Sequence, residues 1–468
     1  MTSKAFCVHG HFYQPPREDP LTGEIPLEPG AAPYSNWNER IYDHCYRPNA
    51  ELGVFQQISF NIGPTLIEWM DQYQKVTLES VIRQDHHNFE KYGVGNAMAQ
   101  AYHHTILPLA SRLDKETQVK WGIADFEFRY GHKPAGMWLP ETAVDIETLE
   151  ILAENGISFT VLAPWQAQIS NLDTSQPYRV PLPGGSSVVV FFYHQELSNQ
   201  VSFDPGATVN ADRFLTEMIL PKLTFATRRL DQPQFLLIAS DGELYGHHQP
   251  FRDKFLAFLT DGAADSKPIQ VSFPALWLRD HPARQSIAIR ENTSWSCHHG
   301  ILRWMGICPC TPHAEWKIPL RTALDQVAEV VDEQYLRVVG PLIPDPWQLR
   351  HQYIHVRHGE ISTPDLIQSL AGKRLDEDTI ARISILLEAQ YERQRMFTSC
   401  GWYFDDFDRI EPRNNVAYAA QAVRLTYQAT GVDLTPRVLP WLSPIKSWRS
   451  GLRADVVYSH FLDRARKN

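Results

Sequence analysis

The first 280 residues contain short apolar segments that are nearly continuous instead of alternating with polar positions. Such segments, rich in β-branched and aromatic residues, are typical of strands buried on both faces of a sheet. We therefore expect buried strands at residues 4–8, 54–62, 135–139, 158–162, 187–193, 234–239 and 269–273.

Helical patterns lie between the apolar segments. Residues 147–155 have such a pattern, which ends at Gly156, and residues 211–230 have another, which contains Pro221. Because strands and helices alternate, this order favours a parallel α/β barrel or a doubly wound sheet.

Beyond about residue 312 the helical pattern continues, but strand signals almost disappear. The predicted helices are residues 320–339, 363–370, 376–397 and 415–430. We therefore expect an α/β domain over residues 1–285 and a helical domain over residues 286–468 that contributes to the cleft.

Composition limits the partners of the chain. Its 468 residues carry a net charge of −10, which argues against a nucleic-acid partner. The apolar runs are too short to span a bilayer and the N-terminus lacks a secretory pattern, so a cytoplasmic protein without a membrane partner is expected. An aromatic content of 11% suits either sugar stacking or a large core. The oligomeric state is not predicted.

The six cysteines include no Cys-x-x-Cys pair, so a disulfide framework is not expected. Three of them, Cys297, Cys308 and Cys310, fall close together in the sequence. The nearby histidines are His298, His299 and His313. This group is either a zinc knuckle of unusual spacing or a set of buried thiols, and no cofactor is predicted from it.

Carboxylates follow two of the predicted strands. Glu141 comes just after residues 135–139, and Asp241 lies two residues beyond residues 234–239. Because the carboxyl ends of parallel barrel strands open on one face, the two side chains can meet there. The pair could perform retaining glycoside chemistry, with Glu141 as nucleophile and Asp241 as general acid/base. A helix-capping Glu and a turn Asp are the structural alternatives.

Histidines end the first predicted strand. His9 and His11 occupy positions i and i+2 of an extended segment, so both imidazoles can face the same pocket. They are either metal ligands, as in the similar pair of amidohydrolases, or hydrogen-bonding groups that orient a substrate. The doublets His103-His104 and His247-His248 leave the same two possibilities open.

Residues 293–304 concentrate side chains that bind sugars. This segment is either part of a binding pocket or a structural junction between the two domains. The side chains concerned are Trp295, His298, His299, Arg303 and Trp304.

Four segments, in the correct order, resemble the sequence regions of glycoside hydrolase family 57. Residues 9–15 look like the first region with an insertion at Phe12-Tyr13, residues 95–108 like the second, residues 136–141 like the third and residues 241–247 like the fourth. The segment around Trp295 stands in place of the fifth. Its Ser-Trp-Ser-Cys motif resembles an uncharacterised segment found in a less studied branch of the family.

The resemblance implies an incomplete (β/α)7 barrel with a C-terminal helical domain. It also implies retaining action on α-glucosidic bonds without a metal. In the family, the Glu of the third region is the nucleophile and the first Asp of the fourth is the acid/base, which are the positions of Glu141 and Asp241 here. Known members include α-amylases, pullulanases, 4-α-glucanotransferases, branching enzymes and α-galactosidases.

The sequence therefore predicts a hydrolase or 4-α-glucanotransferase that acts on α-glucans or maltooligosaccharides. The residues expected to shape the sugar subsite are His9, His11, His104, Trp138, Glu243, Trp295, His298 and Trp304. One alternative is a metal-dependent barrel hydrolase with His9, His11 and Asp241 as ligands. Another is a glucan-binding protein without catalysis, whose tryptophans serve as stacking platforms.

Overall fold

The computed structural model describes residues 3–225, 232–265 and 267–467. The chain forms two compact units that are interleaved in sequence. The first comprises Met1–Gln14, Leu27–Ala101 and Phe126–Ser296, and the second comprises Pro15–Pro26, Tyr102–Asp125 and Cys297–Asn468.

Seven strands in parallel orientation build the first unit. They are β1 (Lys4–Phe12), β2 (Ser59–Ile62), β3 (Ala99–Gln100), β4 (Met137–Trp138), β5 (Phe159–Leu162), β7 (Ser187–Phe192) and β8 (Gln234–Asp241). β1 pairs with both β2 and β8, β3 pairs with β4, and β5 pairs with β7. Parallel bridges from Phe60 to Ala97 and from Gly136 to Phe159 continue this order around the barrel.

The barrel is incomplete between β7 and β8. On this side β7 pairs with the antiparallel strand β6 (Tyr178–Pro181), and β6 pairs with β10 (Gln285–Ser286). A backbone hydrogen bond of 2.7 Å from His194 N to Leu237 O joins the end of β7 to β8. The short strand β9 (Gln270–Val271) lies beside the start of β1. The incomplete (β/α)7 barrel implied by the family resemblance is thus confirmed.

All seven predicted strand segments contain a strand, but one prediction was partly wrong. Within residues 54–62, only β2 is extended, whereas Val54–Gln57 forms the helix α3. Gly53, with a left-handed φ of 73°, precedes this helix, and Val54 and Phe55 are fully buried. A short apolar run can be buried equally well as a helical turn, so tertiary packing decided its conformation. The strands β3, β6 and β10 lay outside the predicted segments.

Helices surround the strands of the first unit. They are α1 (Trp37–Ile41), α2 (Arg47–Glu51), α3, α4 (Pro64–Tyr73), α5 (Lys75–Tyr92), α7 (Ile146–Glu154), α8 (Gln195–Phe203), α9 (Ala211–Arg213), α10 (Leu220–Phe225), α11 (Arg252–Phe258) and α12 (Pro274–Asp280). The helix predicted over residues 147–155 is α7. The helix predicted over residues 211–230 consists of α9, a π-helical stretch (Phe214–Ile219) and α10, and its residues 226–230 lie outside the described residues.

The strands pack around an apolar core, because their side chains are buried nearly from end to end. Within β8 every residue from Gln234 to Ser240 is buried, which fits a strand covered on both faces. One cluster combines side chains from most of the barrel strands, among them Ala5, Cys7, Trp138, Val161, Phe191 and Leu237. A core of this kind holds the strand ends in fixed positions.

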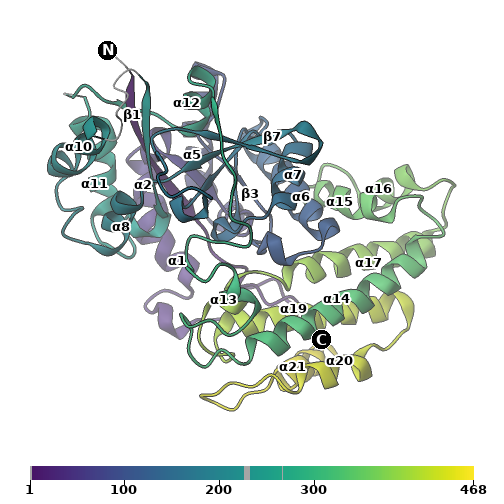
Figure 1. Ribbon diagram of the computed structural model, residues 1–468. Helices are drawn as coiled ribbons and strands as arrows, with labels where there is room; N and C mark the ends of the chain where they lie inside the picture. Colours follow the sequence, from purple (N-terminus) through teal and green to yellow (C-terminus); the bar gives the residue numbers. More distant parts are fainter. Residues whose placement is uncertain (1–2, 226–231, 266, 468) are drawn as a thin grey trace. The chain divides into compact units, whose positions relative to one another are not determined.

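The second unit is helical. Its helices are α6 (Arg112–Tyr130, as far as Asp125), α13 (Leu302–Met305), α14 (Lys317–Val339), α15 (Pro346–Arg357), α16 (Thr363–Leu370), α17 (Glu377–Arg395), α18 (Cys400–Tyr403), α19 (Ile410–Thr430), α20 (Thr435–Leu442) and α21 (Ala454–Ala465). Figure 1 shows α14, α17 and α19 packed side by side. The predicted helices correspond to α14, α16, α17 and α19, with ends that differ by up to five residues.

A buried ionic network connects four helices of the second unit. Asp114 of α6 lies 2.7 Å from Arg393 of α17 and 3.2 Å from Arg350 of α15. Arg393 also pairs with Asp332 of α14 at 2.8 Å. Burial would raise the pKa of Asp114, but Arg393 and Arg350 outweigh it and lower the pKa to about 2.

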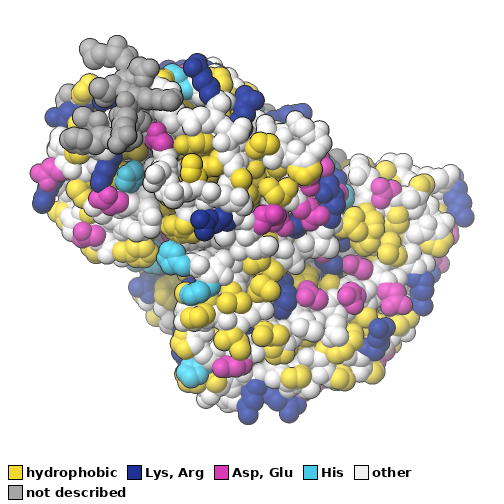
Figure 2. Space-filling view, in the orientation of Figure 1, with side chains coloured by type: hydrophobic (Ala, Val, Ile, Leu, Met, Phe, Trp, Pro, Cys, Tyr) yellow, Lys and Arg dark blue, Asp and Glu magenta, His cyan; other side chains and the backbone are white. Residues whose placement is uncertain are grey.

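The surface carries both signs of charge. Figure 2 shows Lys and Arg side chains interspersed with Asp and Glu side chains on this face of the molecule. Across the described part of the chain, no helix is sufficiently long and apolar to cross a membrane.

Candidate active site

The carboxyl ends of three adjacent strands bring polar side chains together. In the register of the sheet, His11 at the end of β1 lies between Asn61 of β2 and Asp241 of β8. Glu141 follows β4 in a short 3-10 turn (Pro140–Thr142). All four residues belong to the first unit, so the barrel itself positions them.

Glu141 has an unusual backbone conformation. Its φ is 57° and that of Thr142 is 47°, both in the left-handed region that non-glycine residues seldom adopt. The Trp295 backbone N–H donates to the Glu141 carbonyl at 3.0 Å, and Thr142 Oγ1 donates to Gln166 Oε1 at 2.9 Å. Such strained conformations persist only where surrounding contacts hold them, and they concentrate at functional sites.

The Glu141 carboxylate accepts two side-chain hydrogen bonds on the same oxygen. Ser296 Oγ donates to Oε2 at 2.5 Å and Trp295 Nε1 donates to it at 3.1 Å. Hydrogen bonds to an ionised carboxylate are stronger than neutral ones. The two donors therefore stabilise the negative charge and orient the carboxylate.

Asp241 has a strongly shifted acidity. Its side chain reaches solvent at the end of β8 but has protein atoms densely packed around it. This partial desolvation, together with the negative charge of Glu141, raises the pKa of Asp241 to about 7. The two carboxylates are thus close enough to interact, and Asp241 can carry a proton near neutral pH.

Glu243 is a third carboxylate at the same strand end, and it is buried. It accepts hydrogen bonds from Tyr46 Oη at 2.7 Å and from the Tyr13 backbone N–H at 3.0 Å. Burial is the main cause that raises the pKa of Glu243 to about 8, and Asp241 adds to it. These contacts connect the residues after β1 to the residues after β8.

His9 and His11 form one hydrogen-bonded network with Asn61. His9 Nε2 lies 3.1 Å from Asn61 Oδ1 and its Nδ1 lies 3.0 Å from Ser59 Oγ. Asn61 Nδ2 lies 2.9 Å from His11 Nδ1. Burial lowers the pKa of His9 to about 3 and that of His11 to about 4, so both imidazoles are neutral. Both nitrogens of His9 already have hydrogen-bond partners, which leaves this ring poorly suited to bind a metal.

Trp138 packs against both histidines. Its ring stacks on His9 at 4.6 Å and on His11 at 5.1 Å between ring centroids, and Trp295 meets it edge-on at 5.0 Å. Trp138 is fully buried, whereas Trp295 is half-buried. Of these two tryptophans, Trp295 is therefore the one with surface available to a ligand.

Two glycines allow the segment after β8 to pack closely against its neighbours. A Cβ on Gly242 would lie 2.3 Å from the Phe12 ring. A Cβ on Gly246 would lie 2.1 Å from the backbone oxygen of His44, and the φ of Gly246 is 130°. A larger residue would collide at either position, so the glycines allow the close packing that places Asp241 and Glu243.

Three of the predicted site residues belong to the second unit. His104 is buried, has a left-handed φ of 56°, and its Nδ1 lies 2.7 Å from Ser399 Oγ. His298 is exposed, and Trp304 of α13 is fully buried. The other predicted residues, including the two catalytic candidates, lie in the first unit.

Sequence reasoning missed several side chains of this site. Ser296, Asn61, Ser59 and Tyr46 each contact a candidate residue, yet none was predicted as a site residue. Ser296 had a signal, because it belongs to the Ser-Trp-Ser-Cys motif. Asn61 and Ser59 had a weaker one, because they lie in a predicted strand at positions where apolar residues would be expected.

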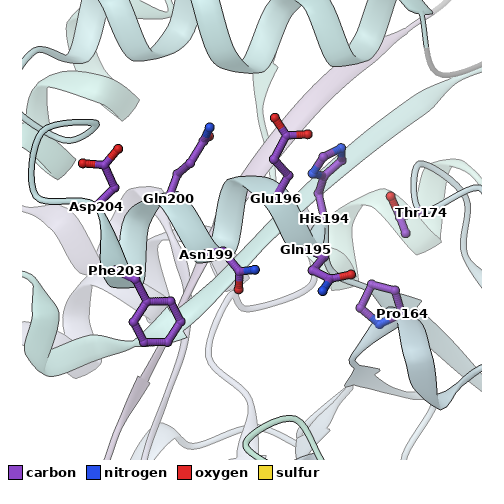
Figure 3. Close-up of a pocket in the computed structure, with 9 residues that line it drawn as sticks. All are labelled: Pro164, Thr174, His194, Gln195, Glu196, Asn199, Gln200, Phe203 and Asp204. Carbon is purple, nitrogen blue, oxygen red and sulfur yellow. The ribbon is translucent and has the colours of Figure 1, made fainter. Parts of the chain in front are cut away.

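A separate pocket of about 640 Å³ lies along α8. Figure 3 shows Glu196, Gln200 and Asp204 on one side of this helix, and Asn199 and Phe203 on the other. The remaining residues that line the pocket are Pro164, Thr174, His194 and Gln195. An exposed aromatic ring among amide and carboxylate groups suits a carbohydrate. The two candidate catalytic residues, Glu141 and Asp241, are not among the residues that line this pocket.

A parallel barrel with interacting carboxylates at its strand ends is an arrangement typical of glycosidases. Comparison with known families agrees with this class. Residues 17–290, more than half of the chain, match the family described as glycosyl hydrolase family 57, and the chain belongs to this family. Residues 313–466 match a domain of unknown function (DUF3536). The family resemblance predicted from the sequence motifs is therefore confirmed.

Two curated relatives share a limited part of the sequence. A 4-α-glucanotransferase of Thermococcus litoralis is 24% identical over 174 residues, which are 36% of this chain and 25% of the relative. An α-amylase of Pyrococcus horikoshii is 23% identical over 173 residues, 36% of this chain and 26% of the relative. The chain thus spans about a quarter of the length of these relatives.

Solved structures show a similar fold over nearly the whole chain. An exo-type maltose-forming amylase of Pyrococcus sp. ST04 has a TM-score of 0.75 at 15% identity, covering 98% of this chain and 88% of its own. A branching enzyme of Pyrococcus horikoshii has a TM-score of 0.62 at 13% identity, covering 99% and 95%. At such identities the likeness concerns the fold alone.

Proposed function

We propose that the protein is a retaining enzyme that acts on the α-glucosidic bonds of α-glucans or maltooligosaccharides, as a hydrolase or a 4-α-glucanotransferase. One observation carries this proposal: Glu141 is held as a carboxylate by two donors, and its charge helps to keep Asp241 protonated. A retaining glycosidase needs this difference between a charged nucleophile and a protonated acid. Membership of the family and its glucan-acting relatives agree with the proposed substrate class.

The first half of the proposed reaction cleaves the glycosidic bond. Glu141 attacks the anomeric carbon, the bond from that carbon to the leaving oxygen breaks, and Asp241 gives its proton to this oxygen. The product is a covalent glucosyl ester of Glu141 and a free sugar hydroxyl. Loss of negative charge at Glu141 lowers the pKa of Asp241, because that charge is one cause of its rise.

In the second half Asp241 acts as a base. It takes a proton from water or from a sugar hydroxyl, the oxygen attacks the anomeric carbon, and the bond to Glu141 breaks. Water as acceptor gives hydrolysis, and a sugar hydroxyl gives transfer. Two inversions at the same carbon leave the α-configuration unchanged.

The remaining residues are proposed to shape the subsite around the scissile bond. His11, which is neutral and stacks on Trp138, contacts the half-buried Trp295. Trp295 in turn hydrogen-bonds Glu141. Glu243 holds the segment after β1 through Tyr13. His9, His104, His298 and Trp304 remain predictions for the same role.

The first experiment compares wild type with Glu141→Gln and Asp241→Asn on maltooligosaccharides and on glycogen. We expect nearly all turnover to be lost in Glu141→Gln, and a loss of about 10²- to 10⁴-fold in Asp241→Asn. Exposed Glu217, which pairs only with Arg213 among the described ion pairs, provides the control Glu217→Gln. Longer as well as shorter oligomers would identify a transferase, and only shorter ones a hydrolase. Wild-type rates in both variants would contradict the proposal.

Azide separates the two roles. With an α-maltosyl fluoride, which needs little acid assistance, Asp241→Ala should form the α-glycosyl azide, since azide attacks the covalent intermediate. Glu141→Ala should form the β-glycosyl azide, because azide replaces the missing nucleophile. The reverse pattern of anomers, determined by NMR, would show that the two residues have been assigned the wrong way round.

A further inference from the structure

Four side chains near the start of Cys297–Asn468, the last segment of the second unit, converge on one point. Cys297, His299, Cys308 and Cys310 each offer a ligand atom, and these atoms lie within 4.8 Å of one another. The segment that carries them, residues 297–316, contains only the short helix α13 as regular α-helix. This segment is therefore a long loop that folds back and brings the four ligand atoms together.

Four of the six distances between these atoms are 3.4–3.9 Å, as in a tetrahedral site. The Sγ atoms of Cys297 and Cys308 are 3.5 Å apart. His299 Nδ1 lies 3.9, 3.5 and 3.4 Å from the Sγ atoms of Cys297, Cys308 and Cys310. Zinc bonds of about 2.3 Å to sulfur and 2.0–2.1 Å to nitrogen place tetrahedral ligands about 3.6 Å apart. The observed separations are close to this value.

We propose that Cys297, His299, Cys308 and Cys310 form a structural zinc site. Three soft thiolates and one imidazole favour zinc over calcium or magnesium, which prefer oxygen ligands. Four protein ligands complete a tetrahedral shell and leave no position for a substrate or a reactive water. Binding releases the three thiol protons to solvent.

The surroundings are consistent with this charge. Zn²⁺ with three thiolates carries a net charge of −1. The buried amino group of Lys317, at the start of α14, donates to the Arg303 carbonyl at 3.2 Å and interacts electrostatically with Cys308 and Cys297. A disulfide between two of the cysteines would not explain why the third thiol and the His299 imidazole point to the same place, whereas one metal ion bound by all four side chains does.

The site has a second consequence, which rests on the proposed function. Cys297 directly follows Trp295 and Ser296 in the chain, and these two residues hydrogen-bond Glu141. Fixing Cys297 restrains the covalent continuation of that segment. Zinc would thus act as a support for the residues that orient the nucleophile and would take no part in the reaction.

The test begins with the metal content of the full chain, purified without chelator and measured by plasma mass spectrometry. We expect one zinc per chain in the wild type. Cys308→Ser, Cys310→Ser and His299→Ala should each lose it, whereas Cys400→Ser and His298→Ala should retain it. Both controls are matched in residue type, and His298 is the direct neighbour of His299. Zinc that persists in all three ligand variants would overturn the proposal.

A second measurement applies if the ligand variants fail to fold. Wild-type chain loaded with Co²⁺ should show thiolate-to-cobalt charge-transfer absorption in the near ultraviolet and the intense visible bands of tetrahedral cobalt. Absence of these bands, or a Cys297–Cys308 disulfide found by mass spectrometry of the non-reduced protein, would overturn the site. Because these readouts need no substrate, zinc without glucan activity would reject the proposed function and leave the metal site intact.

Discussion

A single oxygen atom of Glu141, Oε2, accepts hydrogen bonds from Ser296 and Trp295. These donors come from a segment 154 residues further along the chain, so the barrel must fold before they can act. Their effect is to orient the carboxylate and to stabilise its charge, which a nucleophile requires until it attacks. Ser296 is therefore a positioning residue of the proposed reaction.

Ser296→Ala removes one of the two donors. A hydrogen bond to a charged group contributes about 1.5–3 kcal/mol, so we expect kcat/KM to fall by about 10- to 100-fold. The fold should remain intact, because Ser296 is only half-buried. Kinetics on maltooligosaccharides measure the change, and exposed Ser286 on β10 provides the control Ser286→Ala. An unchanged kcat/KM in Ser296→Ala would contradict this role.

Asp241 titrates in a range that is useful for acid catalysis. Its pKa is raised to about 7 by partial desolvation and by the charge of Glu141, so the protonated form predominates below that pH. We expect kcat/KM to decline as the pH rises through about 7. A basic limb near pH 4, the ordinary range of a carboxyl, would show that the pKa of the catalytic acid is not raised.

The effect of the Glu141 charge on the pKa of Asp241 can be tested directly. Glu141→Gln removes the negative charge, so the pKa of Asp241 should fall below that of the wild type. Infrared difference spectra of the protonated carboxyl can follow this titration without turnover, with Asp241→Asn used to assign the band. Equal values with and without the Glu141 charge would contradict the interaction.

The two catalytic candidates could be predicted from the sequence, because parallel strands bring their carboxyl ends to one face. The hydrogen-bond donors of Glu141 could not. Nothing in the local pattern around Ser296 indicates that its hydroxyl reaches a residue 155 positions earlier. The sequence also could not show which tryptophans a ligand can reach. Trp138 and Trp304 are fully buried, whereas Trp295 is partly exposed.

At the scale of elements, four helices of the second unit depend on one acidic side chain. Asp114 of α6 contacts Arg350 of α15 and Arg393 of α17, and Arg393 extends the network to Asp332 of α14. Removal of one partner from a buried ion pair leaves an uncompensated charge. The helices therefore depend on α6 for electrostatic balance as well as for apolar packing.

Asp114→Asn should destabilise the protein by about 3 kcal/mol near neutral pH. The pKa of Asp114 is lower in the folded than in the unfolded chain, so its stabilising contribution is complete above about pH 4 and disappears as the pH falls through about 2. The difference from wild type should thus shrink in acid. Urea unfolding at about pH 7 and pH 3 measures it, and exposed Asp463, replaced by Asn, is the control.

The four helices predicted in the C-terminal part are all present, and the largest difference is at the start of α19, which begins five residues earlier than predicted. The helix α16 has the predicted ends, and α14 and α17 differ by one to three residues. The short run at residues 54–57 was assigned to a strand and is a helix, because four residues contain too little of either period to decide. Tertiary packing against the barrel decides such a segment.

At the scale of the whole molecule, the two units are interleaved in sequence. Pro15–Pro26 and Tyr102–Asp125 lie within the sequence of the barrel but belong to the helical unit. Within that unit, Arg395 pairs with Glu18, and Tyr418 Oη donates to the Pro16 carbonyl at 3.0 Å. The two compact units therefore do not follow one linear boundary, since local composition does not show where a segment packs. The division into domains over residues 1–285 and 286–468 stays a prediction.

The family, most of the strands and helices, and the two carboxylates at the strand ends could be predicted from the amino-acid sequence. These follow from periodicity and from ordered motifs, which are local properties of the chain. Tertiary structure alone decided which oxygen of Glu141 is held, which charge raises the pKa of Asp241, and which histidine joins the three cysteines. Hydrogen bonds, desolvation and metal geometry depend on distances between residues that are far apart in sequence, and only the folded chain sets those distances.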